Sequence, residues 1–319
     1  MMRPGNCAMA FVGVLIGAIA ELGAFWFLFA PMAEPPSIFY TSWYGLFNSH
    51  YWGILPLILP DYPLIILVTL AATAAFLVTG AGNVLNDYYD RELDKKAHPE
   101  RPIPSGKVSP KDAWQFALIL FSLGIFITML VNWLCLLIAL LNTYLLFIYE
   151  RSYKAKGLSG NFIISYLTAS VFIFGGASVR SFLFVPIFFL LALLANVARE
   201  ITKDIEDMKA DSAYRKTLPM TVGTRGASDR AIFYLWIAII LSFLPLLIMI
   251  MMPGYIWTAY LVKLIGYLAI VLVADVIFIY STNLIMKNPR KAQTRMKLGM
   301  AIAMLAFFLF GAISPVITM

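Results

Sequence analysis

The sequence predicts an all-α, polytopic membrane protein in which nine transmembrane helices form one bundle. Three observations indicate this class. Hydrophobic residues make up 61% of the 319 residues and charged residues only 13%, whereas soluble chains carry about 25% charged residues. The mean hydropathy is +0.83. Apolar runs such as 231–253 are long enough to span a bilayer, which needs roughly 20 residues. A soluble enzyme is excluded, and so is a barrel, whose strands alternate over about ten residues.

The elements follow in order from the apolar runs. The segment between the first two runs, residues 31–60, is rich in aromatic residues and proline, and we expect an external loop with an interfacial helix there. Cys7 and Cys135 lie in or beside apolar segments without a CxxC pair, so both are predicted to be buried free thiols. The predicted spans are 8–30, 63–82, 113–131, 133–149, 161–179, 182–198, 231–252, 257–279 and 298–316.

The positive charges predict the orientation. All 24 lysines and arginines except Arg180 and Lys263 lie near the N-terminus or in alternate connections of the chain. The positive-inside rule therefore places the N-terminus and these connections in the cytoplasm. The net charge of +7 reports this orientation and not nucleic-acid binding. An Ala-x-Ala cleavage site at 18–20 is the alternative at the N-terminus, but the apolar run resumes and is long enough to span. The basic connections are 83–112, 150–160, 199–230 and 280–297.

Two of these connections carry the same acidic pattern. Asp87, Asp90 and Asp94 are spaced i, i+3, i+7, and the pattern recurs 117 residues later. Four predicted spans separate the two copies, so both emerge on one side. We expect a single domain, 1–319, with an internal repeat of four-helix units at about 1–157 and 158–280 and an extra helix at 297–317. The second copy consists of Asp204, Asp207 and Asp211.

Each acidic copy is expected to place three carboxylates in a row on one helix face. Like charges so close repel one another, and a hard divalent cation with oxygen ligands offsets that repulsion. Magnesium typically binds through a few carboxylates plus substrate phosphates. A solvated acidic face paired with lysines and arginines is the ordinary alternative, and its repetition at two span ends makes it less convincing.

Basic residues follow each acidic copy. Arg101 and Lys107 lie in Arg-Pro-Ile-Pro-Ser-Gly-Lys, and Lys216 lies in Lys-Thr-Leu-Pro. Lys154 and Lys156 lie in the connection after the fourth span. Carboxylates that hold metals together with cations that take phosphate oxygens indicate a metal-bridged diphosphate.

These motifs resemble the UbiA-type intramembrane prenyltransferase superfamily. Its first motif, N-D-x-x-D-x-x-x-D, matches Asn86, Asp87, Asp90 and Asp94, and its second, D-x-x-D-x-x-x-D, begins at Asp204. The start of the first helix, Arg-Pro-x-Asn, is similar as well. Within the superfamily the chain most resembles archaeal digeranylgeranylglyceryl phosphate synthases. The Arg-Pro-Ile-Pro-Ser-Gly run, however, is shared with chlorophyll synthases and does not settle the acceptor.

The resemblance implies a prenyltransferase that moves a prenyl group from an isoprenyl diphosphate, geranylgeranyl diphosphate above all, to a lipophilic acceptor in the bilayer. Geranylgeranylglyceryl phosphate is the favoured acceptor, and an aromatic quinone precursor is the alternative. Two Mg²⁺ ions are implied, and Asp87 or Asp211 would take the acceptor proton. The implied metal ligands are Asn86, Asp87, Asp90, Asp94, Asp204, Asp207 and Asp211; the diphosphate ligands are Asn83, Arg101, Lys154, Lys156 and Lys203; the prenyl contacts are Tyr88, Tyr144 and Tyr149.

Two other functions use the same residues differently. A cation transporter would place its ion site near the middle of the bilayer, whereas these carboxylates cluster at span ends beside cations. A membrane terpene cyclase would use the diphosphate chemistry without an acceptor.

Three ionisable residues lie inside predicted spans. For Glu21 and Asp275 we expect hydrogen bonds in helix packing, whereas Lys263 is expected to extend toward the outer face. The oligomeric state is open.

Overall fold

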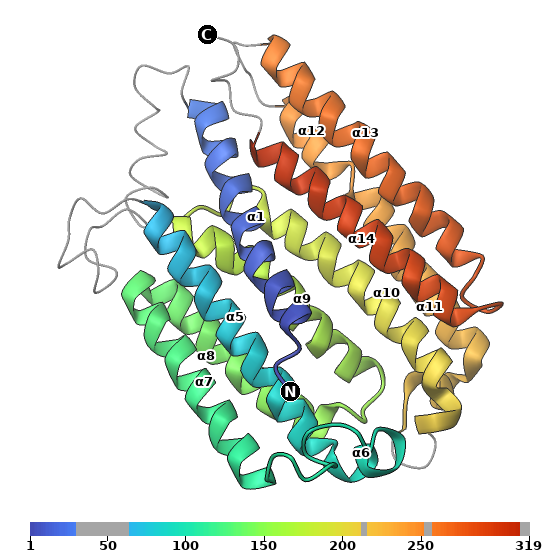
Figure 1. Ribbon diagram of the computed structural model, residues 1–319. Coiled ribbons are helices and arrows are strands. Elements are labelled where there is room, and N and C mark those ends of the chain that lie inside the picture. The colour runs from blue at the N-terminus through green and yellow to red at the C-terminus, as the bar shows by residue number, and fades with distance from the viewer. Residues whose placement is uncertain (30–63, 212–215, 252–256, 313–319) are drawn as a thin grey trace.

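The computed structural model describes residues 1–29, 64–211, 216–251 and 257–312 and confirms the predicted class (Figure 1). In these ranges, nine helices are long and apolar enough to cross a membrane. The segment 31–60, expected as an external loop, lies outside the described residues. The nine are built on α1 (Pro4–Phe29), α5 (Leu64–Tyr89), α7 (Pro110–Val131), α8 (Trp133–Ile148) continued by the π-helical turn η2 (Tyr149–Tyr153), α9 (Leu158–Val179), α10 (Val185–Asp211), α11 (Leu218–Leu241) continued into α12 (Leu244–Met251), α13 (Trp257–Thr282) and α14 (Pro289–Ala312). The short helix α6 (Arg91–Ala97) lies between α5 and α7.

Polar side chains determine where the helices begin and end. The Ser109 hydroxyl accepts a hydrogen bond from the Asp112 N–H (3.1 Å), and Pro110 follows in the first turn of α7. Asn132 alone separates α7 from α8. Its side-chain oxygen accepts from the Cys135 N–H (2.9 Å), and its amide donates to the Ala177 carbonyl (2.9 Å). The chain therefore reverses at one buried residue, as the predicted boundaries 131 and 133 required.

Several helices extend beyond the apolar runs that predicted them. Helix α10 continues to Asp211 and α11 begins at Leu218, so most of the expected connection 199–230 is helical. Helix α14 begins at Pro289, nine residues before its apolar run. Hydropathy falls where a helix leaves the hydrocarbon, but its backbone hydrogen bonds continue beyond that point. The predicted connections were too long for this reason.

Helix α1 lies at the centre of the bundle and packs against α5, α9 and α14 (Figure 1). Helices α5, α7 and α8 lie on one side of α1, and α10, α11, α13 and α14 lie on the other. Consecutive helices pack as α1–α5, α5–α7 and α7–α8 in the first half and as α9–α10, α10–α11 and α11–α13 in the second. The duplication itself stays a prediction.

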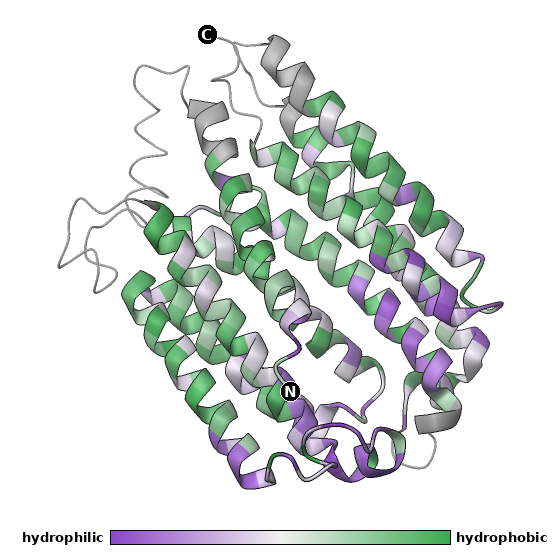
Figure 2. Cartoon of the chain, viewed as in Figure 1, coloured by the Kyte–Doolittle hydropathy of each residue, from purple (hydrophilic) through white to green (hydrophobic). Residues whose placement is uncertain are grey.

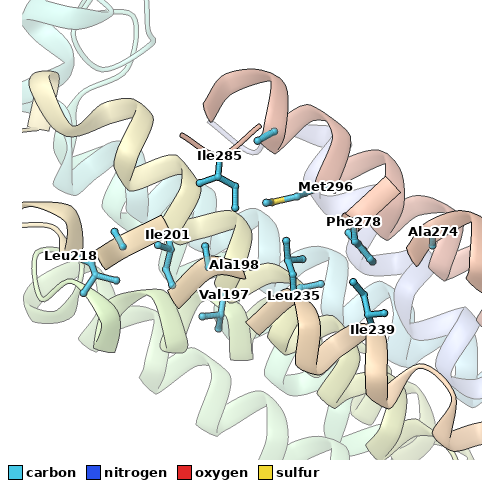
Figure 3. Close-up of a cluster of buried hydrophobic side chains, with 14 residues drawn as sticks. Val197, Ala198, Ile201, Leu218, Leu235, Ile239, Ala274, Phe278, Ile285 and Met296 are labelled. Atoms are coloured by element: carbon cyan, nitrogen blue, oxygen red, sulfur yellow. The ribbon is translucent and has the colours of Figure 1, made fainter. Parts of the chain in front are cut away.

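Small residues bring α1 and α9 into close contact. A Cβ atom on Gly17 would lie 2.5 Å from the Phe172 carbonyl oxygen, and one on Gly175 would meet the Val14 carbonyl. Close backbone approach is how helices pack without a hydrophobic driving force. On the other side, apolar side chains from α10, α11, α13 and α14 converge in one cluster (Figure 3). The polar ends of these helices are held in place by this packing.

Glu21 caps the start of α10 from the neighbouring helix α1. Its fully buried carboxylate accepts backbone N–H groups of Leu183 (2.8 Å), Phe184 (2.7 Å) and Val185 (2.7 Å), and the Ser181 hydroxyl (2.6 Å). These N–H groups precede or open the helix and have no partner within it. The expected packing role of Glu21 is confirmed.

The other buried polar groups also follow expectation. Asp275 accepts a hydrogen bond from the Ser242 hydroxyl (2.8 Å), which ties α13 to the end of α11. Cys7 and Cys135 are free thiols with no exposed surface, as predicted. The side chain of Lys263 lies outside the described part of the chain.

Candidate active site

Hydrophilic residues gather at one end of the bundle, which holds the first residues of the chain, α6 and the last turns of α10 (Figure 2). The two acidic motifs end α5 and α10, so both reach this polar end. The two motifs therefore lie at the same end of the bundle, as their positions after the second and sixth spans predicted.

The first acidic motif, residues 86–94, crosses a helix break. Helix α5 ends at Tyr89, and the backbone at Asp90 (φ −82°, ψ 0°) departs from helical values before α6 begins. Asp94 therefore lies on a separate short helix, and the expected single row of three carboxylates is wrong in this detail. On the outer face of α6, a hydrogen bond from Lys95 (2.8 Å) holds the pKa of the exposed Glu92 below its usual value.

Each carboxylate of this motif binds a cation. Arg3 donates to Asp87 (2.8 Å) and to the side-chain oxygen of Asn86 (3.0 Å). Arg101 contacts both oxygens of Asp94, at 2.8 and 2.7 Å. Asp87 and Asp94 are each only 5% exposed, so their charges require such partners. The predicted role of Arg101 beside the acids is consistent with this position.

Lys154 completes the set of cations. It bridges Asp90 and Glu150, with both Nζ–O distances at 2.7 Å. The Asn86 amide donates to the other oxygen of Glu150 (2.9 Å), and the Asn83 amide donates to the Met2 carbonyl (2.8 Å). Glu150 was absent from the predicted site, although its place at the start of a basic connection was a usable signal.

The second acidic motif, residues 204–211, lies on the uninterrupted helix α10. Asp204 accepts from the Asn161 amide (2.8 Å) at the start of α9. Glu206, between the two aspartates, accepts from Gln293 of α14 (2.5 Å). Asp207 is half-buried, and Lys203 is exposed on the same helix. The side chain of Asp211 lies outside the described residues.

A short segment, residues 149–161, connects the two motifs. Its Glu150 and Lys154 contact the first motif and its Asn161 contacts the second. In its middle, Lys156 forms a parallel backbone bridge with Lys216, which precedes α11. The Lys156 side chain is exposed and lies over the Tyr153 ring, 4.2 Å from its centroid.

The three predicted prenyl contacts have different surroundings. The Tyr88 ring packs against Trp114 of α7, with centroids 5.1 Å apart, and takes the Arg91 guanidinium at 4.6 Å. Tyr149 opens the π-helical turn and is half-buried. Tyr144 is 62% exposed and shares the outer face of α8 with Leu137 and Leu141. The structure thus brings Tyr88 and Tyr149 to the polar end and leaves Tyr144 on the outer surface.

The donor set fits magnesium in kind. Carboxylate and amide oxygens are the hard ligands that Mg²⁺ prefers. In this structure, protein cations contact these oxygens, so each oxygen is in a position to bind positive charge. Among the described residues, no three acidic, histidine or cysteine side chains form a ready metal-binding group. Mg²⁺ commonly uses only one or two carboxylates and takes its remaining ligands from phosphate and water.

Membrane-length helices with carboxylates, amides and cations at one end define a multi-pass membrane protein with a polar site at one membrane surface. Residues 46–310 match the UbiA prenyltransferase family, and the chain belongs to it. It is therefore a prenyltransferase.

Comparison with individual proteins agrees with this family. A digeranylgeranylglyceryl phosphate synthase of Methanosarcina mazei is 42% identical over 73% of this chain and 78% of its own. A solved digeranylgeranylglyceryl phosphate synthase has a TM-score of 0.70 at 31% identity, with 98% of this chain and 96% of that chain covered. A UbiA homologue from Archaeoglobus fulgidus bound to GPP and Mg²⁺ has a TM-score of 0.58 at 16% identity, over 96% and 99% of the chains, and shows the shared fold.

Proposed function

We propose that the protein transfers a geranylgeranyl group from geranylgeranyl diphosphate to the free hydroxyl of geranylgeranylglyceryl phosphate in a Mg²⁺-dependent reaction. The observation that carries the proposal is the 31% identity to a solved synthase of this kind over 98% of the chain. The set of buried acids and cations at one end of the bundle supplies the chemistry such a reaction needs.

Magnesium would be held by the oxygens of the two acidic motifs. Asn86, Asp87 and Asp90 belong to the first motif, and Asp204 and Asp207 belong to the second. When bound, two Mg²⁺ ions would neutralise the diphosphate and so make it a better leaving group. The UbiA homologue from Archaeoglobus fulgidus that is bound to GPP and Mg²⁺ supports the use of magnesium.

The chain's own cations would act on the same leaving group. Arg101 and Lys154 now lie on Asp94 and Asp90. Both cations would donate hydrogen bonds to the phosphate oxygens, where charge accumulates as the allylic C–O bond breaks. Lys156, Lys203 and Asn83 are further candidates. Tyr88 and Tyr149 would offer ring faces to the allylic cation.

The transfer is complete when the acceptor oxygen bonds to the allylic carbon and loses its proton. Diphosphate leaves with the electrons of the broken C–O bond. The proton would go to a carboxylate of the site, Asp87 or Asp211. Asp87 is buried beside Asn86 at the polar end of α5.

The polar end of the bundle would face the cytoplasm because it carries nearly all the lysines and arginines. A Lys107→Cys variant in intact cells tests this orientation. It should react with a membrane-permeant thiol reagent and not with an impermeant one, while Cys7 and Cys135 are buried and serve as the background. Labelling by the impermeant reagent would reverse the assignment.

A panel of acceptors tests the activity. Purified protein receives geranylgeranyl diphosphate, Mg²⁺ and either geranylgeranylglyceryl phosphate, a hydroxybenzoate or no acceptor, and products are identified by mass spectrometry. We expect diphosphate release only with the glyceryl phosphate lipid. Prenylation of the benzoate would replace the proposal with an aromatic prenyltransferase, and release without an acceptor would indicate a cyclase.

A further inference from the structure

A second polar site lies at the start of α14, apart from the acidic motifs. A pocket of about 510 Å³ opens between side chains of its first turns. Three of the six lining residues are cations, two are polar and one is apolar. They are Asn288, Arg290, Lys291, Thr294, Arg295 and Leu298, and together they are called the α14 pocket below.

The cations of the α14 pocket are not neutralised by the protein. No aspartate or glutamate follows Asp275 in the sequence. Within the described residues, none of Arg290, Lys291 and Arg295 forms an ion pair, and all three are exposed. Lys287 and Lys297 add two more positive charges within the same eleven residues. These exposed cations are therefore available to an anion from outside the chain.

The opposite face of α14 is fixed against the bundle. Ala292, Gln293 and Met296 are buried, and Gln293 donates to Glu206 of α10. The Asn288 side chain caps the helix by accepting from the Lys291 N–H (2.9 Å). The pocket side chains therefore project from a rigid helix and point away from the bundle.

On the outer face of α14, exposed charged residues are followed directly by exposed apolar residues. Below the cations, Leu298 (44% exposed), Leu305 (49%) and Phe308 (37%) continue on the same side at helical spacing. Lys291 and Leu298 are seven residues apart, which is about 10 Å along a helix. Exposed apolar residues on a membrane helix contact acyl chains, so the cations lie at the depth of the lipid phosphates.

We propose that the α14 pocket binds the phosphate head group of an anionic membrane lipid. Arg290, Lys291 and Arg295 hold the phosphate oxygens, Asn288 and Thr294 supply neutral hydrogen bonds, and Leu298 contacts the first part of the acyl chain. Guanidinium and ammonium groups at a membrane surface are the usual ligands of such phosphates. General membrane orientation needs positive charge but requires neither a pocket nor its alignment with an acyl-facing stripe.

Native mass spectrometry of the full chain tests the proposal. Detergent-solubilised protein receives equal amounts of dioleoylphosphatidylglycerol and dioleoylphosphatidylcholine. We expect about a tenfold preference for bound phosphatidylglycerol, and we expect Arg290→Gln/Lys291→Gln/Arg295→Gln to abolish it. The matched control, Lys95→Gln/Lys107→Gln/Lys111→Gln, removes the same charge at the same end of the bundle and should keep the preference.

Three outcomes would overturn the inference. They are equal binding of both lipids by the wild type, an equal loss in both triple variants, and retention of the preference by the pocket variant. An excess of inorganic phosphate should leave the lipid bound, and its displacement would assign the pocket to free phosphate. If the triple variant fails to fold, Arg295→Gln alone should still lower the preference severalfold.

Discussion

The first acidic motif crosses a helix break, whereas the second lies on one continuous helix. In the first, Asp87, Asp90 and Asp94 are held by Arg3, Lys154 and Arg101. In the second, Asp204 accepts a hydrogen bond from the Asn161 amide, and α10 is capped at its far end by Glu21. Equal spacing in sequence has thus produced one motif whose carboxylates are paired with protein cations and one carried by a single continuous helix.

This difference predicts how the motifs divide the work. Under the proposed function, metal at the first motif would compete with the protein cations paired there, and those cations would then be available to the diphosphate. The second provides a rigid set of oxygens. Both are needed for transfer, but only substitutions in the first should change stability and activity together.

The largest expected effect comes from removing one carboxylate of either motif. Asp90→Asn and Asp207→Asn should each lower turnover about 10³-fold, because charge on the leaving group loses its stabilisation. Asp229→Asn, an exposed position on α11, is the matched control. Steady-state rates with geranylgeranyl diphosphate at varied Mg²⁺ measure this, and chelation of Mg²⁺ should reduce all variants to the same level. Full turnover of either variant would remove its motif from the site.

The next largest effect comes from replacing one cation beside each motif. Arg101→Gln removes the partner of the buried Asp94 and should destabilise the protein by about 2 kcal/mol, while also lowering turnover. Lys203→Gln, on the exposed surface of α10, should leave the thermal midpoint unchanged. Thermal unfolding in detergent and product formation are both measured. Equal stability of the two variants would show that the ion pair of Arg101 with Asp94 does not hold α6 in place.

The sequence predicted the positions of both motifs but not the helix break inside the first one. Spacing i, i+3, i+7 and the position after an apolar run were enough to bring both to one end of the bundle. No proline or glycine marks Asp90, so the departure from helical geometry there had no local signal. Asp90 does have a tertiary partner, Lys154, which lies 64 residues further along and could not be predicted from local sequence.

The partners of the acids that are distant in the sequence could not be predicted for the same reason. Arg3 meets Asp87 across 84 residues, and Asn161 meets Asp204 across 43. Hydropathy and spacing are local quantities and contain no information on such pairs. The orientation of Tyr144 could not be predicted either, because the sequence did not show that this side of α8 faces outward.

Rigidity of α10 can be tested at the end remote from the acids. Glu21→Gln replaces one carboxylate oxygen by a donor that faces backbone N–H groups, and should destabilise the protein by about 2 kcal/mol. Glu92→Gln, whose carboxylate is exposed, is the control and should change little. The thermal midpoint is measured with and without Mg²⁺. If α10 is rigid because of this cap, Glu21→Gln should also weaken Mg²⁺ binding, and an unchanged affinity would show that the helix is held by packing alone.

The smallest expected effect comes from replacing the side chain that contacts the first aspartate of each motif. Arg3 is 41% exposed at its side chain and pairs with Asp87, so under the proposed function it would compete with metal for that carboxylate. Arg3→Gln should therefore lower the Mg²⁺ concentration for half-maximal activity about twofold, the scale of an ion pair worth roughly 0.5 kcal/mol. Asn161→Ala removes a neutral donor from Asp204 and with it a contact that orients the carboxylate, so it should raise that concentration by a similar factor. Mg²⁺ titrations of both variants at saturating donor measure the two shifts. Opposite signs would support the exchange of cation for metal in the first motif and preorganisation in the second, whereas shifts of the same sign would mean that the two motifs bind metal alike.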